Sequence, residues 1–179
     1  MHSLTKYEFN GIALSIIVMI LTLVVLHEKT NILSSKNDTH QTPEIKLVTE
    51  ENTHAKSLEE SLIDSRTAKG DFVKLIINDV ALGTGERSVV NGDTISVNYI
   101  GQTTTGIQFD NSFKRGEPFT FTIGQGRVIK GWEEGFIGMK VGGKRILVIP
   151  ADMAYGNRQV GNIPANSPLI FAVELVAIK

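Results

Sequence analysis

The residue types that most often carry catalysis are unevenly placed along this 179-residue chain. All four histidines lie before residue 60, and there is no cysteine. Thiol nucleophiles, disulfides and thiolate metal sites are therefore excluded. A folded domain in the C-terminal part must act without imidazole, the commonest general base and metal ligand. With 18 basic and 19 acidic residues, the charge balance gives no reason to expect nucleic acid as a partner.

The most distinctive group of residues is the run 125–135, with the sequence QGRVIKGWEEG. It holds the single tryptophan, Trp132, close to the branched aliphatic residues Val128 and Ile129. An indole is too large to be left in solvent beside such neighbours. Together with the glycines on either side of the tryptophan, this run predicts one short helix that places the indole under an apolar pocket.

Motifs for nucleotide, metal or covalent chemistry fail in the same part of the chain. Residues 138–145 nearly match the phosphate-binding pattern GxxxxGK[ST], but Arg145 replaces the magnesium-holding hydroxyl residue, and a strand rather than a helix should follow. Glu133 and Glu134 are neighbours on the predicted helix, where they cannot face one point, so we expect them on its surface. Asp110 is isolated in the sequence. No metal and no cofactor is predicted.

Apart from that run, the sequence after residue 70 is dominated by β-branched and aromatic segments. Glycine-rich turn signals separate these segments at spacings typical of an antiparallel sheet. The expected strands cover 72–77, 94–100, 119–123, 145–149 and 169–178. The pattern therefore predicts an α+β domain over 71–179 that is mostly strand, with one short helix.

The N-terminal part has a different character. Residues 11–26, GIALSIIVMILTLVVL, carry no charge and come close to the ~17 residues that are the lower limit for a membrane-spanning helix. No small-x-small cleavage site leads into residue 27, so an uncleaved anchor is favoured over a cleaved signal peptide. A buried helix of a soluble protein is the third alternative, which the lack of a polar face disfavours.

The anchor is expected to separate a short head, 1–10, from a polar tether, 27–70, that contains no aromatic residue. A capping-box pattern at 57–60 allows a few helical turns there, and a solvated helix or coil is favoured over a partner-binding helix. Charges flanking the anchor barely decide its orientation. Because such anchors usually leave a short head inside, we expect the C-terminal domain outside the cytoplasm, in the periplasm or at the cell exterior.

Three stretches of the C-terminal part together resemble the FKBP family of peptidyl-prolyl cis-trans isomerases. They read VNYIGQTTTGIQFDNSF, PFTFTIGQGRVIKGWEEGFIGMKVGGKRILVIPADMAYG and IPANSPLIFAVELVAIK, in the family's order and with nearly its spacing. The resemblance covers 72–179. It implies a strongly curved antiparallel sheet wrapped around one short helix, which agrees with the strand and turn pattern.

The resemblance also implies an aromatic pocket with Trp132 as its floor. The residues it implies in catalysis are Tyr99, Asp110, Trp132, Tyr155 and Phe171. Those it implies in substrate binding are Phe109, Arg115, Phe119, Val128, Ile129 and Ile163.

Asp110 is expected at the rim of this pocket, beside its apolar wall, where Tyr99 and Arg115 can hold the carboxylate. Two other aromatic residues, Phe121 and Phe136, are expected to serve plain core packing.

The implied reaction suits a site without histidine. Rotation about an X-Pro bond crosses a barrier of ~18–20 kcal/mol but breaks no bond, so it needs neither a nucleophile nor a proton shuttle. An apolar pocket withdraws water from the planar, charge-separated amide and so favours the twisted transition state. Removing about 8 kcal/mol from the barrier gives a rate gain of order a millionfold. Backbone donors near Ile129 and the hydroxyl of Tyr155 are expected to bind the substrate carbonyls.

The implied partners are proline-containing polypeptides, whose folding the enzyme would accelerate, and macrolide inhibitors. The loop 157–163 departs from the family, since it is slightly shorter than in eukaryotic relatives and has polar Asn162 before Ile163. The contacts of this loop with long substrates and with macrolides are therefore expected to differ from those in the relatives. The alternative function is a non-catalytic FKBP-like binding or chaperone module tethered to the membrane.

Overall fold

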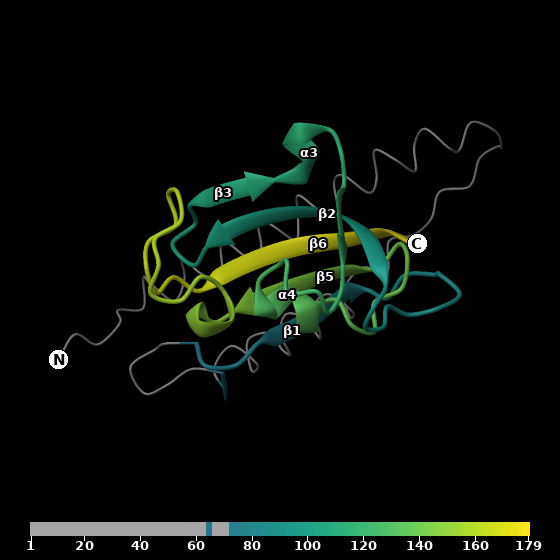
Figure 1. The fold of residues 1–179 in the computed structure, drawn as a ribbon, viewed down its shortest axis with the longest axis horizontal. Helices are drawn as coiled ribbons and strands as arrows, with labels where there is room; N and C mark the ends of the chain where they lie inside the picture. Colours follow the sequence, from purple (N-terminus) through teal and green to yellow (C-terminus); the bar gives the residue numbers. More distant parts are fainter. Residues whose placement is uncertain (1–63, 66–71) are drawn as a thin grey trace, which may run out of the picture.

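The computed structural model describes residues 64–65 and 72–179 (Figure 1). The predicted head at 1–10 and the predicted anchor at 11–26 lie outside the described residues, as does nearly all of the tether. Among the helices of the described part, none is long and apolar enough to cross a membrane.

The described part of the chain forms strands joined by short helical segments. The strands are β1 Ile76–Ala81, β2 Thr94–Thr103, β3 Gln108–Asn111, β4 Phe119–Thr122, β5 Lys144–Ile149 and β6 Leu169–Ile178. The helical segments are α3 Ser112–Arg115, α4 Lys130–Gly135 and the 3-10 turn η1 Ala151–Met153.

All strand pairs are antiparallel, and the strand order is β1-β5-β6-β2-β3, with β4 paired to the first half of β2. The long strands β2, β6 and β5 curve side by side, and α4 lies across one face of them (Figure 1). The predicted fold class, a curved antiparallel sheet with one short helix against it, is confirmed for this domain. We call the face that carries α4 the inner face of the sheet.

Helix α4 can approach β5 closely because two of its residues lack side chains. A Cβ atom on Gly131 would lie 2.4 Å from Cγ2 of Ile149, and one on Gly135 would lie 2.8 Å from Cδ1 of Leu147. Real Cβ atoms do not come so close to other atoms, so larger residues would push the helix away from the sheet. The close approach brings Trp132, which is buried, down onto the inner face.

The C-terminal end of α4 is held by Arg145 of β5. The guanidinium donates hydrogen bonds to the carbonyl oxygens of Gly135, at 2.6 Å, and Ile137, at 3.1 Å. Asp79 of β1 accepts two further hydrogen bonds from it, at 2.7 and 3.1 Å. Carbonyls at the end of a helix lack partners within the helix, and a buried arginine supplies them here. This explains structurally why arginine stands where a phosphate-binding loop would have a hydroxyl residue.

The hydrophobic core has two parts, one on each face of the sheet. On the inner face, Leu147 and Ile149 of β5 pack with Phe136 of the segment after α4. On the outer face, Ile146 and Val148 of the same strand belong to a second cluster. Strand β5 is therefore buried on both faces, and it reads as a continuous apolar run rather than an alternating one.

Three strands differ from the sequence prediction by more than one residue, and one of them, β2, runs to Thr103, beyond its predicted end at 100. The predicted strand 72–77 is wrong at its ends, because β1 begins at Ile76 and continues through Asn78 and Asp79, polar residues that mark turns more often than strands. Its pairing with β5 and the contact between Asp79 and Arg145 stabilise this extension. Strand β3 was not predicted, since its four residues, QFDN, include only one apolar side chain.

Candidate active site

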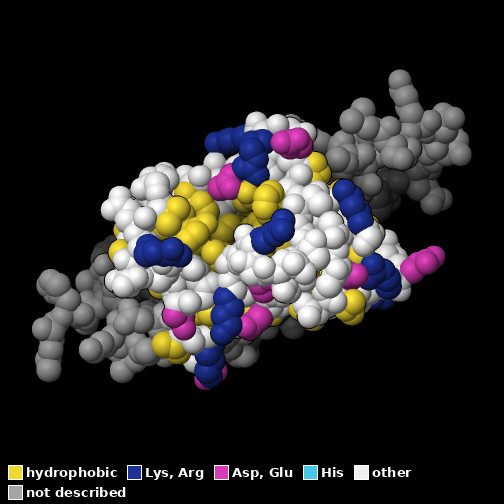
Figure 2. All heavy atoms as spheres, viewed as in Figure 1, with side chains coloured by type: hydrophobic (Ala, Val, Ile, Leu, Met, Phe, Trp, Pro, Cys, Tyr) yellow, Lys and Arg dark blue, Asp and Glu magenta, His cyan; other side chains and the backbone are white. Residues whose placement is uncertain are grey.

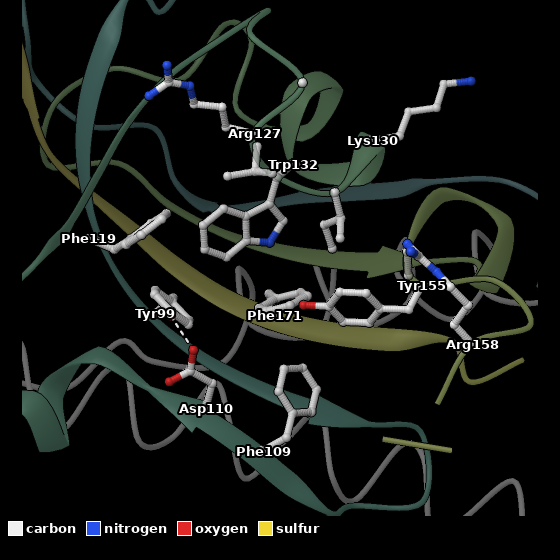
Figure 3. A pocket seen from close by; sticks show the side chains of 14 residues that line it. Tyr99, Phe109, Asp110, Phe119, Arg127, Lys130, Trp132, Tyr155, Arg158 and Phe171 are labelled. Atoms are coloured by element: carbon white, nitrogen blue, oxygen red, sulfur yellow. Dashed lines mark hydrogen bonds between the residues drawn. The ribbon is translucent and has the colours of Figure 1, made fainter. Parts of the chain in front are cut away.

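A cavity of about 510 Å³ opens on the inner side of the sheet. Its wall comes from β2, β3, β4, β6, α4 and the segments before α4 and after η1 (Figure 3). The lining residues are Tyr99, Phe109, Asp110, Phe119, Gly126, Arg127, Val128, Ile129, Lys130, Trp132, Ala154, Tyr155, Arg158 and Phe171. On the surface, the same face shows an apolar hollow with basic side chains around its mouth (Figure 2).

Three buried aromatic rings form the floor of the cavity. The ring of Trp132 lies 4.9 Å from that of Tyr99 and 5.1 Å from that of Phe171, both in edge-to-face geometry. Such pairs are worth about 0.5–1.5 kcal/mol beyond the area that they bury. Each ring is therefore fixed by its neighbours, and the floor is rigid before any ligand enters.

The indole nitrogen of Trp132 is buried and has no conventional hydrogen-bond partner among the described residues. It lies on the side of the indole that faces Phe171 (Figure 3), whose ring is inclined at 76° to the indole plane. The floor therefore contains one buried donor that no conventional acceptor in the described residues satisfies.

Tyr99 is positioned by a break in the sheet edge. Strand β2 pairs with β4 up to Val97 and with β3 from Ile100 onward, so Tyr99 has no strand partner on that side. Ser112, at the start of α3, fills the gap with its side chain. Its Oγ accepts a hydrogen bond from the Tyr99 backbone N–H at 2.8 Å and lies 3.3 Å from the Tyr99 carbonyl oxygen. Ser112 is fully buried, so water cannot replace it in this role.

Asp110 is neutralised at the rim by two partners. It accepts hydrogen bonds from the Tyr99 hydroxyl and from the Arg115 guanidinium, and Arg115 also donates to the Tyr99 hydroxyl at 2.9 Å. Burial alone would raise the pKa of Asp110, but the hydrogen bonds from Tyr99, the Asn111 backbone and Arg115 outweigh it and hold the pKa below its ordinary value. Burial and the contact with Asp110 raise the pKa of Tyr99 to about 12. At neutral pH this group is an ion pair with a neutral phenol.

Phe109 reaches the cavity because Gly101 leaves space on β2. The rings of Phe109 and Phe171 meet edge to face at 5.6 Å. A Cβ atom on Gly101 would lie 2.7 Å from the ring of Phe171 and 2.8 Å from that of Phe109. Any other residue at this position would separate the two rings.

Two hydrogen-bond donors remain available at the mouth of the cavity. The Tyr155 hydroxyl points into the cavity (Figure 3) and has no hydrogen-bond partner within the described part of the chain. Burial, followed by the negative charge of Asp110, raises the pKa of this hydroxyl, so it stays protonated. The backbone N–H of Ile129 makes no backbone hydrogen bond in the range 72–179. Each donor can therefore serve a ligand carbonyl.

Glu133 has a role that the sequence did not reveal. Its carboxylate accepts hydrogen bonds from the backbone N–H groups of Gly124 and, at 2.8 Å, Gly126. Glu133 is only partly exposed on α4, and its carboxylate folds back to bind the turn that leads into the helix. In this way Glu133 positions the segment that carries Val128 and Ile129.

The structure brings most of the residues implied by the resemblance into one place. All of them line the cavity except Arg115, which reaches it through Asp110 and Tyr99, and Ile163. Ile163 is 4% exposed and packs in the inner core instead. Its neighbour Val160 pairs with it across a tight turn and is exposed.

Sequence reasoning missed three basic residues that line the cavity, Arg127, Lys130 and Arg158. Arg127 and Lys130 flank two predicted wall residues, which was the signal that could have indicated them. Arg158 lies in the loop 157–163, and its proximity to the cavity depends on how that loop folds. Within the described residues, no group of three or more His, Asp or Glu side chains could hold a metal ion.

Comparison with known proteins places this geometry in a family. The model of the family described as FKBP-type peptidyl-prolyl cis-trans isomerase matches residues 85–176. FK506-binding protein 1A of Neurospora crassa is 58% identical over 98 residues, which are 54% of this chain and 82% of that protein. The FK506-binding protein of Neisseria meningitidis serogroup A is 50% identical over 105 residues, covering 58% of this chain and 95% of the relative.

Longer relatives and a solved structure match the same domain. FK506-binding protein 4 of Gibberella zeae is 51% identical over 120 residues, and the match spans only 23% of that protein. The crystal structure of AtFKBP13 matches with a TM-score of 0.55 and 38% identity, covering 64% of this chain and 98% of the other. The chain therefore belongs to the FKBP-type peptidyl-prolyl cis-trans isomerases, and its activity is the cis-trans isomerisation of X-Pro peptide bonds.

Proposed function

We propose that the substrate proline ring rests on the indole of Trp132, with the rings of Tyr99 and Phe171 on either side. The observation that carries this proposal is the rigid floor of three buried aromatic rings within a cavity of about 510 Å³. An apolar ring packed on such a floor excludes water from the amide that precedes it. The planar amide, which is the more charge-separated form, then loses more solvation than the twisted transition state.

The donors at the mouth orient the chain on either side of the proline. The Tyr155 hydroxyl and the Ile129 N–H each donate to a substrate carbonyl, and both are free to do so in the described part of the chain. Fixing two carbonyls while the intervening bond rotates converts binding energy into rate. The Asp110–Arg115 pair holds Tyr99 in place and moves no proton in this mechanism.

The test measures isomerisation with the full-length chain and a proline tetrapeptide, using NMR exchange so that no protease is needed. We expect kcat/KM to lie well above the buffer rate, and Tyr155→Phe to lower it by roughly two- to tenfold, the loss of one hydrogen bond. Folding of each protein is checked by circular dichroism. A folded wild-type chain with no acceleration would contradict the proposed mechanism.

The sequence also supports a proposal about location, in which 11–26 anchors the chain and the isomerase domain acts outside the cytoplasm on proteins that are folding there. The support is the uncharged run of apolar residues followed by the polar stretch at 27–70. Protease added to cells whose cytoplasmic membrane is sealed, after removal of any outer membrane, should then digest the domain. A domain that stays protected until the membrane is opened would refute this orientation.

The names of the relatives support a second ligand. We propose that this cavity binds FK506, since the residues that line it lie within 85–176, the segment that matches the family model, and the relatives named above are FK506-binding proteins. FK506 should compete with proline peptides for quenching of Trp132 fluorescence. Peptide binding that is unaffected by saturating FK506 would show that the loop 157–163 excludes the macrolide.

A further inference from the structure

The mouth of the cavity carries an uneven distribution of charge. Four charged residues line it, namely Asp110, Arg127, Lys130 and Arg158. Asp110 is paired with Arg115, so the side of the mouth formed by β3 is close to neutral. The three basic residues, Arg127, Lys130 and Arg158, lie at separate places around the rest of the mouth, and we refer to them as the basic rim (Figure 3).

Members of the basic rim are poorly compensated. Arg127 and Arg158 are exposed and form no ion pair within the described residues. Lys130 lies 3.8 Å from Glu134, in an exposed pair that contributes little. The other nearby carboxylate, Glu133, is directed at the backbone of the 124–126 turn. Net positive charge therefore remains around an apolar cavity.

An apolar cavity strengthens the field at its mouth, because low-dielectric walls focus the field lines into the opening. Arg127 and Arg158 lie at different ends of the cavity that contains Trp132 (Figure 3), so the residues that flank a proline placed on the indole can pass close to either one. A carboxylate on such a residue gains two things there: attraction to the rim, and bidentate hydrogen bonds that a planar guanidinium offers. A lysine in the same place would be repelled.

We propose that the basic rim makes this isomerase selective for prolines flanked by Asp or Glu. The proposal rests on the binding mode under Proposed function, and it adds a substrate class to it: polypeptide segments in which an acidic residue directly precedes or follows the proline. The apolar floor binds the proline itself. Arg127 and Arg158 attract a carboxylate on the residue beside the proline, and Lys130 contributes less to this attraction.

The experiment compares peptides that differ only in charge. Two tetrapeptide series carry Glu, Gln or Lys directly before or directly after the proline, and Glu and Gln have nearly the same shape. Affinity for the full-length chain is measured by fluorescence of Trp132, the single tryptophan, so the readout does not depend on turnover. NMR exchange gives kcat/KM for the same peptides.

We expect the affinity order Glu, Gln, Lys in at least one series at low ionic strength. The Glu to Gln ratio should be roughly 1.5- to fivefold, the range for one exposed ion pair. Near 1 M salt, where the Debye length is about 3 Å, the ratio should approach one. A Glu to Gln ratio of one or less in both series at low salt would overturn the proposal.

Substitutions of the basic-rim arginines test whether these residues cause the selectivity. The double variant Arg127→Gln/Arg158→Gln should bring the Glu to Gln ratio close to one, and because both peptides are measured on the same protein, any general loss of binding cancels. Arg87→Gln removes the same kind of charge away from the cavity, where Arg87 pairs with Asp93, and should leave the ratio unchanged. A ratio that survives in the double variant, or that falls equally in Arg87→Gln, would refute the assignment.

The two proposals fail in different ways. Absence of isomerisation with the neutral Gln peptides would contradict the proposed mechanism, while the affinity ratio would still decide whether the rim selects charge. Isomerisation of all peptides with the same affinity and kcat/KM would leave the mechanism standing and remove the selectivity.

Discussion

The floor and the rim of the cavity are built in opposite ways. Trp132, Tyr99 and Phe171 are each 5% exposed or less, and each is fixed by edge-to-face contacts with another ring. Arg127 and Arg158 are exposed and have no ion-pair partner within the described residues. Buried rings that hold one another in place suit a site that binds a single shape, the proline ring. Solvated charges act over longer distances and can adjust to different residues beside the proline. The rate of isomerisation should therefore depend on the floor, and selectivity for charged peptides on the basic rim.

The largest effect is expected from removing the floor itself. Trp132→Ala should destabilise the fold by about 3–5 kcal/mol, since it leaves a cavity in the core. It should also lower kcat/KM by roughly tenfold or more, which corresponds to at least about 1.4 kcal/mol of lost transition-state stabilisation. Urea unfolding and NMR exchange measure the two effects separately.

The matched control for this variant lies on the outer face of the sheet. Ile170 is fully buried there, away from the cavity. Ile170→Ala should lower the free energy of unfolding by about 2–5 kcal/mol while kcat/KM stays near that of the wild type. If both variants lose activity equally, general stability rather than the floor sets the rate.

A smaller effect is expected from removing the hydrogen bond that holds the backbone of Tyr99. Ser112→Ala removes the side chain that accepts the hydrogen bond of the buried Tyr99 N–H, at a cost of about 1–3 kcal/mol. Because Tyr99 then loses its anchor, kcat/KM should fall as well, by less than in Trp132→Ala.

Ser96→Ala is the comparison for that variant. The Ser96 hydroxyl bonds to the exposed Thr120 hydroxyl at 2.8 Å, and water can replace it. We expect a loss of about 0.5–1.5 kcal/mol and an unchanged kcat/KM. An effect of Ser112→Ala no greater than that of Ser96→Ala would show that the gap in the sheet edge tolerates water.

The neutral side of the rim predicts a modest dependence of stability on pH. The pKa of Asp110 is lowered in the folded state, so its contribution is complete above the ordinary aspartate pKa of about 3.9 and is lost as the pH falls through the lower folded value. Urea unfolding of the wild type and of Asp110→Asn should differ by a constant amount above about pH 5. The difference should shrink below about pH 4. A difference that grows on acidification would mean that the pKa is raised instead.

The smallest effect expected is on the pH dependence of the rate. No group that contacts the proposed substrate titrates near neutrality, because the pKa of Tyr99 is raised to about 12 and that of Tyr155 is also raised. With no proton transfer in the reaction, kcat/KM for an uncharged peptide should vary by less than about twofold between pH 6 and 9. A bell-shaped profile in that range would indicate a general acid or base and would contradict catalysis by desolvation.

Most of the fold could be predicted because its signals are local. The apolar runs around β2, β5 and β6 carry their own strand pattern, and the glycines beside Trp132 mark a short helix. Strand β3 could not be predicted, because its four residues become a strand only by pairing with β2. The same holds for Ile163, an apolar residue that the sequence could place equally well in the wall or in the core.

The sequence alone determined the kind of chemistry that this domain can perform. Without histidine or cysteine after residue 60, and with one tryptophan among apolar neighbours, it leaves binding and desolvation rather than proton or nucleophile transfer. Only the tertiary structure decided how the site is held: Ser112 fills the gap beside Tyr99, Arg145 caps α4, and three basic residues come together around the mouth of one cavity. The physical reason is the distance along the sequence over which each interaction acts. A residue's type and its neighbours determine local conformation and chemistry, whereas contacts such as that between Arg145 and Asp79, 66 positions apart, exist only after the whole sheet has formed.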